Sequence, residues 1–187
     1  MVHGAAVAVD EDRGLLLAGP GGSGKSCTSL SGLLDPLKFL GDDYTGLSLG
    51  ATPRVHSLYA SAKVYPDQVS RLHLSGMDLE ETNEDEGKSI LFLHPDSQKS
   101  LLKSAVLKAV VIPQVTGGQT TEFEPFSKIK TLRALAPSSL FQLPYAGISD
   151  FEGLSALVKE SPTYRLRLGT EPQEIHEALV AFLHAQS

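Results

Sequence analysis

Residues 19–26 of the chain read Gly-Pro-Gly-Gly-Ser-Gly-Lys-Ser, and this stretch decides which fold the sequence favours. It satisfies the pattern G-x-x-x-x-G-K-[S/T] in full. Glycines allow the backbone to turn tightly, so that its N–H groups point inward at phosphate oxygens, and the helix that follows adds the positive end of its dipole. An apolar run precedes the stretch and a helical pattern follows it. The sequence therefore predicts a phosphate-binding loop (P-loop).

Each position of the P-loop has an expected task. Lys25 would reach the β- and γ-phosphates of a nucleotide, and the Ser26 hydroxyl would take one position around Mg²⁺. The nearby helix end could lower the pKa of the Cys27 thiol, although we interpret Cys27 as a small packing residue beside the nucleotide. The residues expected to line the nucleotide are Gly19, Gly21, Gly22, Ser23, Gly24, Lys25, Ser26 and Cys27.

The sequence on either side of the P-loop alternates between strand and helix patterns. Residues 4–9 and 14–18 are apolar runs joined by a charged turn, and 25–34 carries leucines at helical spacing as far as Asp35-Pro36. A short strand over 37–40 follows. Strand, loop, helix and strand in this order are typical of a phosphate-binding α/β unit.

The remaining sequence predicts more strands and a largely helical C-terminal third. Strands are expected over 44–49, 57–64, 90–93, 106–115 and 164–168. Helices are expected over 66–72, 125–135, around 151–158, and from a Thr170/Gln173 capping box through Leu183. A turn is expected at 116–119 and a loop at the acidic stretch 78–86. We therefore expect a single α/β domain over 1–187, with a mixed sheet and a helical C-terminal part, and the native chain could begin further upstream.

Two adjacent carboxylates, Asp42 and Asp43, follow the strand expected at 37–40. A carboxylate at a strand end beside a P-loop is typical of a second Mg²⁺ anchor. Two of them favour two tasks, because one can hold the metal while the other accepts a proton. The alternative is that the pair only forms a turn or a helix cap.

The composition of the chain restricts the classes of molecule that it is expected to bind. The chain has 16 Lys and Arg against 22 Asp and Glu, and six of these acids fall within 78–86, so the net charge of −6 is a local feature. No basic footprint for nucleic acid is present, and no apolar run approaches the roughly 20 residues of a membrane span. The single cysteine, Cys27, and the lack of a signal pattern favour the cytoplasm. The acidic stretch is expected to be a solvated loop, or a lid or docking surface for a basic acceptor.

These residues together resemble the catalytic domain of HPr kinase/phosphorylase, a family that shares its nucleotide-binding fold with phosphoenolpyruvate carboxykinase. The resemblance covers residues 2–49. It rests on Val2-His3-Gly4, on the strand–turn–strand leading into the P-loop, and on the Asp pair soon after Lys25. By this resemblance Asp42 is the general base that takes the acceptor's proton and Asp43 the carboxylate on the metal side. His3 matches a histidine that precedes the loop, and we include it among the catalytic candidates.

The sequence further downstream resembles shorter HPr-kinase-like proteins, a branch that includes kinases of lasso peptides. The resemblance is carried by Arg54 with 55–59, by Lys63, and by 132–140. A Gly-Arg signature associated with the phosphorylase reaction has no counterpart. Phosphoryl transfer usually recruits a cation to stabilise the equatorial oxygens, and the candidates in order are Arg54, Lys63 and Arg133.

The leading hypothesis is a kinase that uses ATP and Mg²⁺ to phosphorylate a hydroxyl, most simply a serine of a peptide or small protein. Two alternatives stay open. One is a nucleotide-binding pseudokinase or regulatory module, and the other is a small-molecule phosphotransferase of the carboxykinase type. The sequence shows no motif that recognises the base of a nucleotide, so GTP and pyrophosphate also remain open as phosphoryl donors. We expect self-association, because relatives form oligomers and an uncovered sheet edge would need a partner.

Overall fold

The computed structural model describes residues 1–187 except 73, 75–76, 82–86, 94–97, 143–145 and 187. Its centre is a nine-stranded mixed sheet in which seven strands follow the order β1-β5-β6-β10-β3-β2-β4, while β12 pairs with β10 and β11 with β12. The strands are β1 (Val2–His3), β2 (Ala5–Asp10), β3 (Arg13–Leu17), β4 (Lys38–Gly41), β5 (Tyr44–Ser48), β6 (Arg54–His56), β10 (Ser104–Gly118), β11 (Glu122–Pro125) and β12 (Thr163–Gly169). The pairs β10–β3 and β10–β12 are parallel, and the other pairs among these described strands are antiparallel. The expected mixed α/β sheet is confirmed.

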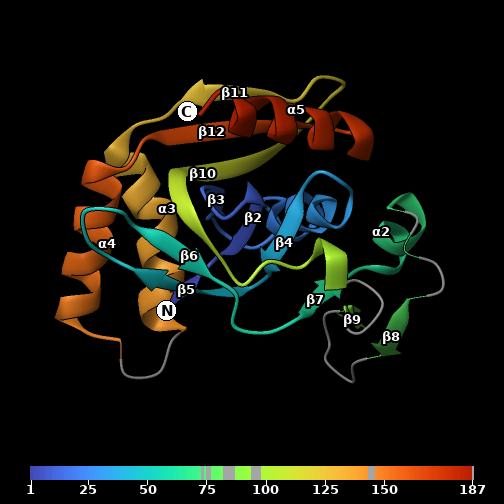
Figure 1. Ribbon diagram of the computed structural model, residues 1–187, viewed down its shortest axis with the longest axis horizontal. Coiled ribbons are helices and arrows are strands. Elements are labelled where there is room, and N and C mark those ends of the chain that lie inside the picture. Colours follow the sequence, from blue (N-terminus) through green and yellow to red (C-terminus); the bar gives the residue numbers. More distant parts are fainter. Residues whose placement is uncertain (73, 75–76, 82–86, 94–97, 143–145, 187) are drawn as a thin grey trace.

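The alternation of side chains along β3 explains why helices cover both faces of this sheet. Leu15 and Leu17 point into one core with α5 (Pro172–His184), and Leu16 points into another with α3 (Lys128–Phe141) and α4 (Ile148–Glu160). Successive residues of a strand face opposite sides, so an uninterrupted leucine run requires two covered faces. Figure 1 shows α5 along β12 and β10, with α3 and α4 beside the other face.

A second, three-stranded sheet extends from the helix that follows the P-loop. It is antiparallel in the order β7-β9-β8, from β7 (Ser61–Val64), β8 (Asp78–Glu81) and β9 (Ser89–Phe92), with α2 (Pro66–Arg71) beside it. Its core joins Val64, Leu91 and Leu93 to Leu30 and Phe39 of the main body. The small sheet is thereby fixed next to the end of β4.

The strand–loop–helix–strand order around residues 19–26 is confirmed. β3 ends at Leu17, the loop follows, and α1 (Lys25–Leu30) continues into a 3-10 turn, η1 (Ser31–Leu33), before β4. The helix is held at its start by the Thr28 hydroxyl, which donates to the carbonyl of Gly24. Both strands, β3 and β4, flank β2 in the sheet, so the loop and the Asp pair begin close together.

Several local predictions are wrong because pairing across the sheet overrides the local signal. The acidic stretch was expected to be a loop, but 78–81 forms β8 against β9; residues 82–86 lie outside the described part of the chain. The turn expected at 116–119 is largely the end of β10, which runs on to Gly118 beside β12. β6, next to Pro53, has no strong pattern and is held by β5 and β10.

Proline and capping signals also misplace three helix boundaries. Pro125 ends β11 instead of opening a helix, since β11 pairs with β12 there. α3 begins at Lys128 and continues through Pro137 to Phe141, because buried Leu135 and Ala136 anchor that part of the helix. α5 starts after Glu171 with Pro172 in its first turn, so Thr170 is not its cap. In the described residues, no helix is long and apolar enough to cross a membrane.

Leu15→Ala tests the importance of the core beneath α5. Leu15 is completely buried, so truncation should lower the free energy of unfolding by about 2–5 kcal/mol. Ile129→Ala is the matched control, because Ile129 is 73% exposed and its truncation should change stability by less than about 0.5 kcal/mol. Urea denaturation of both variants measures the difference. Equal effects would contradict this packing.

Candidate phosphate-binding and catalytic site

The P-loop is held open by glycines at positions where side chains do not fit. Gly19, Gly22 and Gly24 have φ values of 144°, 76° and 103°, a region that other residues rarely adopt. A Cβ at Gly24 would in addition overlap Cδ1 of Leu168 on β12. A Cβ at Gly21, by contrast, would have no neighbour within 4 Å, so the middle of the loop faces open space. The loop is therefore a tight backbone cradle seated on β12 and open outward.

Lys25 lies across this cradle. Its Nζ donates to the carbonyls of Gly19 at 2.8 Å and Pro20 at 3.1 Å, and the residue is 7% exposed. Burial lowers the pKa of Lys25, while the charges of Asp42 and Asp43 act in the opposite direction. The ammonium group is thus placed at the loop, between backbone carbonyls and carboxylates, where a nucleotide's terminal phosphates would supply the missing anionic partner.

Asp42, directly after β4, is almost completely buried, with 1% of its surface exposed. Its Oδ2 accepts from the backbone N–H of Lys63 at 3.2 Å, and its Oδ1 accepts from the Ser29 hydroxyl at 3.4 Å. Burial, with the neighbouring charge of Asp43 as a second cause, raises the pKa of Asp42 to about 6, although a hydrogen bond from Ser26 opposes this. A carboxylate that titrates near neutral pH is suited to accept a proton.

Asp43 has a different environment. Its φ is 61°, a strained value for a residue other than glycine, and its backbone carbonyl accepts from Gly4. His3 Nε2 lies 3.8 Å from Asp43 Oδ1, which is an ion-pair distance and too long for a hydrogen bond, and this interaction with His3 is the main reason that the pKa of Asp43 is lowered. The two carboxylates therefore differ, since Asp43 stays ionised where Asp42 can take up a proton.

His3 itself is fixed from two directions. Its backbone N–H donates to the hydroxyl of Ser139 on α3, and its ring packs at a tilt against Tyr44, with 5.4 Å between ring centroids. β1 pairs only with β5, so these contacts hold the short strand at the sheet edge. The sequence suggested that His3 belongs to the site, and the structure places it against Asp43.

Tyr59, which the sequence analysis included only as part of the stretch 55–59, is a positioning residue. Its hydroxyl donates to the Asp42 carbonyl at 2.6 Å and accepts from the backbone N–H of Tyr44 at 3.1 Å. It thereby holds the strained turn between β4 and β5. Ser29, which hydrogen-bonds to Asp42, was missed. The only hint in the sequence was its position on α1 one helical turn after Ser26.

Two cavities meet at the carboxylates. One of about 530 Å³ runs over the P-loop, with Lys25, Ser26, Cys27 and Asp43 in its wall, and continues to Arg71 and Thr170. The other, about 280 Å³, is lined by Asp42, Asp43, Tyr59 and Lys63. We call the first the phosphate cavity. Lys63 and Lys88 both line the phosphate cavity and bring positive charge to it.

One expectation about an individual residue is wrong. Arg54 lies away from the P-loop on β6, where its guanidinium donates to the carbonyl of Glu11 and to the Ser104 hydroxyl. It is therefore not placed to stabilise a transferred phosphoryl group. Burial raises the pKa of the Cys27 thiol, and Cys27 forms part of the cavity wall, in agreement with its interpretation as a small packing residue.

The donor set fits Mg²⁺ bound together with a nucleotide. Within the described residues, no group of three or more His, Cys, Asp or Glu side chains could hold a metal alone. Mg²⁺, however, is usually held by one or two carboxylates, a hydroxyl, water and substrate phosphates. Ser26 and Asp43 in one cavity wall, with Asp42 hydrogen-bonded to Ser26, provide those protein groups.

Comparison with known proteins finds likeness at the level of solved structures only. No protein-family model matches the sequence, and no curated protein matches it. Among solved structures, the Hpr(Ser) kinase/phosphatase from Coxiella burnetii is similar with a TM-score of 0.49 and 10% sequence identity, over 96% of this chain and 93% of that chain. A likeness at this level says nothing about the role of any residue, so the site rests on the geometry described above.

The unusual environment of Asp42 predicts a pH-dependent gain in stability for Asp42→Asn. Because the folded-state pKa of about 6 exceeds the ordinary 3.8, the folded protein is penalised as pH rises from 3.8 through 6. At pH 8 the penalty is fully present, and Asp42→Asn should raise the free energy of unfolding by on the order of 3 kcal/mol. Below the ordinary pKa of Asp the two proteins should be equally stable.

Urea denaturation at several pH values measures this effect, with Asp78→Asn on the exposed face of β8 as the control. The control should show no pH-dependent gain. An Asp42→Asn variant that is less stable than the parent at pH 8 would mean that the carboxylate is well compensated.

Proposed function

We propose that the protein is a kinase that transfers the γ-phosphate of ATP to a hydroxyl group, with a serine of a peptide or small protein as the acceptor. The single observation that carries this proposal is the buried carboxylate of Asp42, whose pKa is near neutral, next to Lys25 and Ser26 of a P-loop. A nucleotide-binding site alone needs no such base, whereas transfer to a hydroxyl does.

The residues divide the work between binding and proton transfer. Backbone N–H groups of the P-loop hold the phosphates, and Lys25 neutralises the β- and γ-phosphates. Ser26 and Asp43 would hold Mg²⁺, which when bound neutralises charge on the phosphate oxygens. Asp42 accepts the proton of the acceptor hydroxyl. At the same time the acceptor oxygen bonds to the γ-phosphorus, and the bond between that phosphorus and the ADP oxygen breaks. Lys63, in the wall of the phosphate cavity, takes the stabilising place that Arg54 does not occupy.

One observation favours exchanging the two carboxylates. The hydroxyl of Ser26, the expected Mg²⁺ ligand, hydrogen-bonds to Asp42, while Asp43 lines the phosphate cavity directly. In that arrangement Asp42 would support the metal and Asp43 would face the acceptor. The lowered pKa of Asp43 makes it the weaker base, so we retain Asp42 in that role.

Transfer of γ-phosphate to a panel of serine peptides, with Asp42→Asn and Asp43→Asn compared across Mg²⁺ concentrations, tests the proposal. Loss of the base should lower kcat by about 10²–10⁴ at saturating Mg²⁺, and loss of the metal carboxylate should mainly raise the Mg²⁺ concentration needed. Asp42→Asn should show the first pattern. If the patterns are exchanged between the variants, the roles are exchanged as well.

Lys25→Ala provides the matching test of the nucleotide site, and its nucleotide affinity should fall because the one ammonium group in the cradle is lost. Asp42→Asn should keep that affinity, measured by calorimetry. Nucleotide binding without transfer to any hydroxyl acceptor would make the protein a nucleotide-binding module instead of a kinase.

The pH profile of kcat/KM should report the Asp42 carboxyl of the free protein. Below about pH 6 the carboxyl is protonated and cannot accept a second proton, so kcat/KM should fall about tenfold per pH unit. Above that value the rate should level off. Measurement of kcat/KM between pH 5 and pH 8 at saturating Mg²⁺, with folding verified by circular dichroism, tests this prediction. A flat profile would contradict Asp42 as the base.

A further inference from the structure

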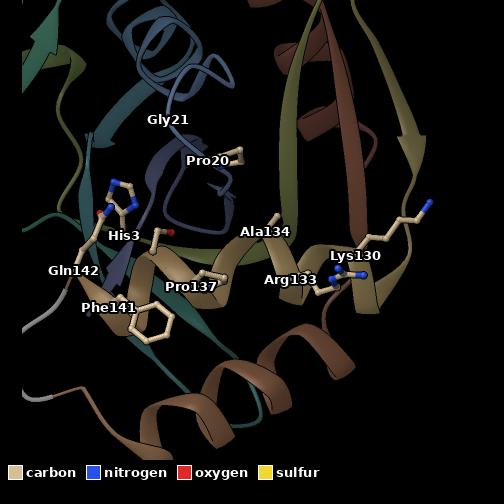
Figure 2. A pocket seen from close by; sticks show the side chains of 10 residues that line it. His3, Pro20, Gly21, Lys130, Arg133, Ala134, Pro137, Phe141 and Gln142 are labelled. Carbon is tan, nitrogen blue, oxygen red and sulfur yellow. The ribbon is translucent and has the colours of Figure 1, made fainter. Parts of the chain in front are cut away.

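A third cavity, of about 660 Å³, lies between the start of the P-loop and α3 (Figure 2). We call it the α3 cavity. Its wall includes Pro20 and Gly21 on the loop side and Ala134 and Pro137 on the helix side. No step of the proposed nucleotide binding uses this space.

The α3 cavity opens onto the reacting end of the phosphate cavity. His3, Gly21 and Gln142 line both cavities, so they form the boundary between them. His3 also contacts Asp43. A group that enters past His3 therefore arrives at Asp43, while the other end of the phosphate cavity, at Thr170 and Ile175, remains for the nucleoside.

The chemistry of the α3 cavity is apolar with two cations. Pro20, Ala134, Pro137 and Phe141 provide the apolar wall, and Phe141 is 88% exposed. Figure 2 shows Lys130 and Arg133 together at the opposite end of α3 from His3 and Gln142.

Charge in this cavity is of one sign. The described residues in its wall include no carboxylate, and none of the described acids forms an ion pair with Arg133. Lys130 Nζ lies 5.9 Å from the centre of the Phe126 ring, and none of the acids that the structure describes forms an ion pair with it. On a chain of net charge −6, this is a local site that attracts anions.

We propose that the α3 cavity binds the acceptor as an acidic peptide segment, with its serine at His3 and an acidic side chain at Lys130 and Arg133. The assignment rests on the proposed kinase function and adds the class of substrate to it. It differs from the basic acceptor that the acidic stretch 78–86 suggested, because the wall of the α3 cavity contains two cations and no carboxylate among its described residues.

The length of α3 sets the spacing between the two groups of such a peptide. At a rise of 1.5 Å per residue, Arg133 lies about 13 Å from Gln142 along the helix axis. An extended peptide covers this distance in about four residues. The preferred acceptor therefore carries Asp or Glu about four residues from the serine, with apolar residues between them to contact Pro137 and Phe141.

Synthetic fluorescein-labelled peptides with one serine and one Glu, placed at each position in turn, test this inference against matched Gln and Lys peptides. The wild-type protein should phosphorylate the peptide with the Glu about four residues from the serine with at least about fivefold higher kcat/KM than its Gln counterpart, as two partly exposed ion pairs would produce. Arg133→Glu should abolish or reverse this preference while leaving nucleotide affinity unchanged. Lys159→Glu, on α4 and outside the cavity wall, is the control of equal charge change.

Fluorescence polarisation of the same peptides, measured with a non-hydrolysable ATP analogue bound, separates the two proposals. Arg133-dependent binding of the acidic peptide without transfer would overturn the kinase function and support the α3 cavity as a site for acidic peptides. Transfer without any preference for Glu, or with a preference that Arg133→Glu does not change, would overturn the inference and leave the kinase function standing. Equal effects of Arg133→Glu and Lys159→Glu would also overturn it, because they would show a general charge effect.

Discussion

The burial of the Asp42 carboxylate is the constraint on which the rest of the site depends. Removing a carboxylate from water is costly unless hydrogen bonds and opposite charges replace the water. Here the replacement is incomplete: a backbone N–H from β7, hydroxyls from α1, and the buried ammonium of Lys25 approach it, yet Asp43 adds a repulsive charge. The residual imbalance keeps the pKa near neutral, and that is the property a proton acceptor requires. The burial that lowers the stability of the folded protein at Asp42 is therefore also the cause of the raised pKa of its carboxyl.

The sheet makes this arrangement possible by aligning strand ends. β3, β10 and β12 run parallel, so their carboxyl ends, near Ala18, Val115 and Leu168, lie on the same side of the sheet. The P-loop lies over these strand ends, with Gly24 against Leu168 and Val115. Apolar side chains support the loop from below while its backbone stays open to the phosphate cavity. Asp42 and Asp43 directly follow β4, which is antiparallel to β2, and lie in the turn that Tyr59 holds.

The parts that could be predicted are those whose structure is set within a few residues. The P-loop, the strand before it, the helix after it and the Asp pair follow from glycine geometry, leucine spacing and the stop at Asp35-Pro36. Predictions failed where a distant strand supplied the missing hydrogen bonds. Arg54 resembled a transition-state cation, yet pairing of β6 with β10 directs it to Ser104. Pro125 resembled a helix start, yet β12 makes it a strand end.

Residues 19–43 therefore carried enough local information to indicate phosphate binding and the position of the carboxylates, because backbone dihedrals, loop glycines and strand ends are specified by near neighbours. The different environments of Asp42 and Asp43, the contact of His3 with α3 across 136 positions, and the α3 cavity beside the P-loop arise from packing between segments far apart in the chain. Burial and charge at a site depend on everything packed around it. No short stretch contains that information, so tertiary packing alone decides the burial of Asp42, the surroundings of Asp43 and the cavity beside the P-loop.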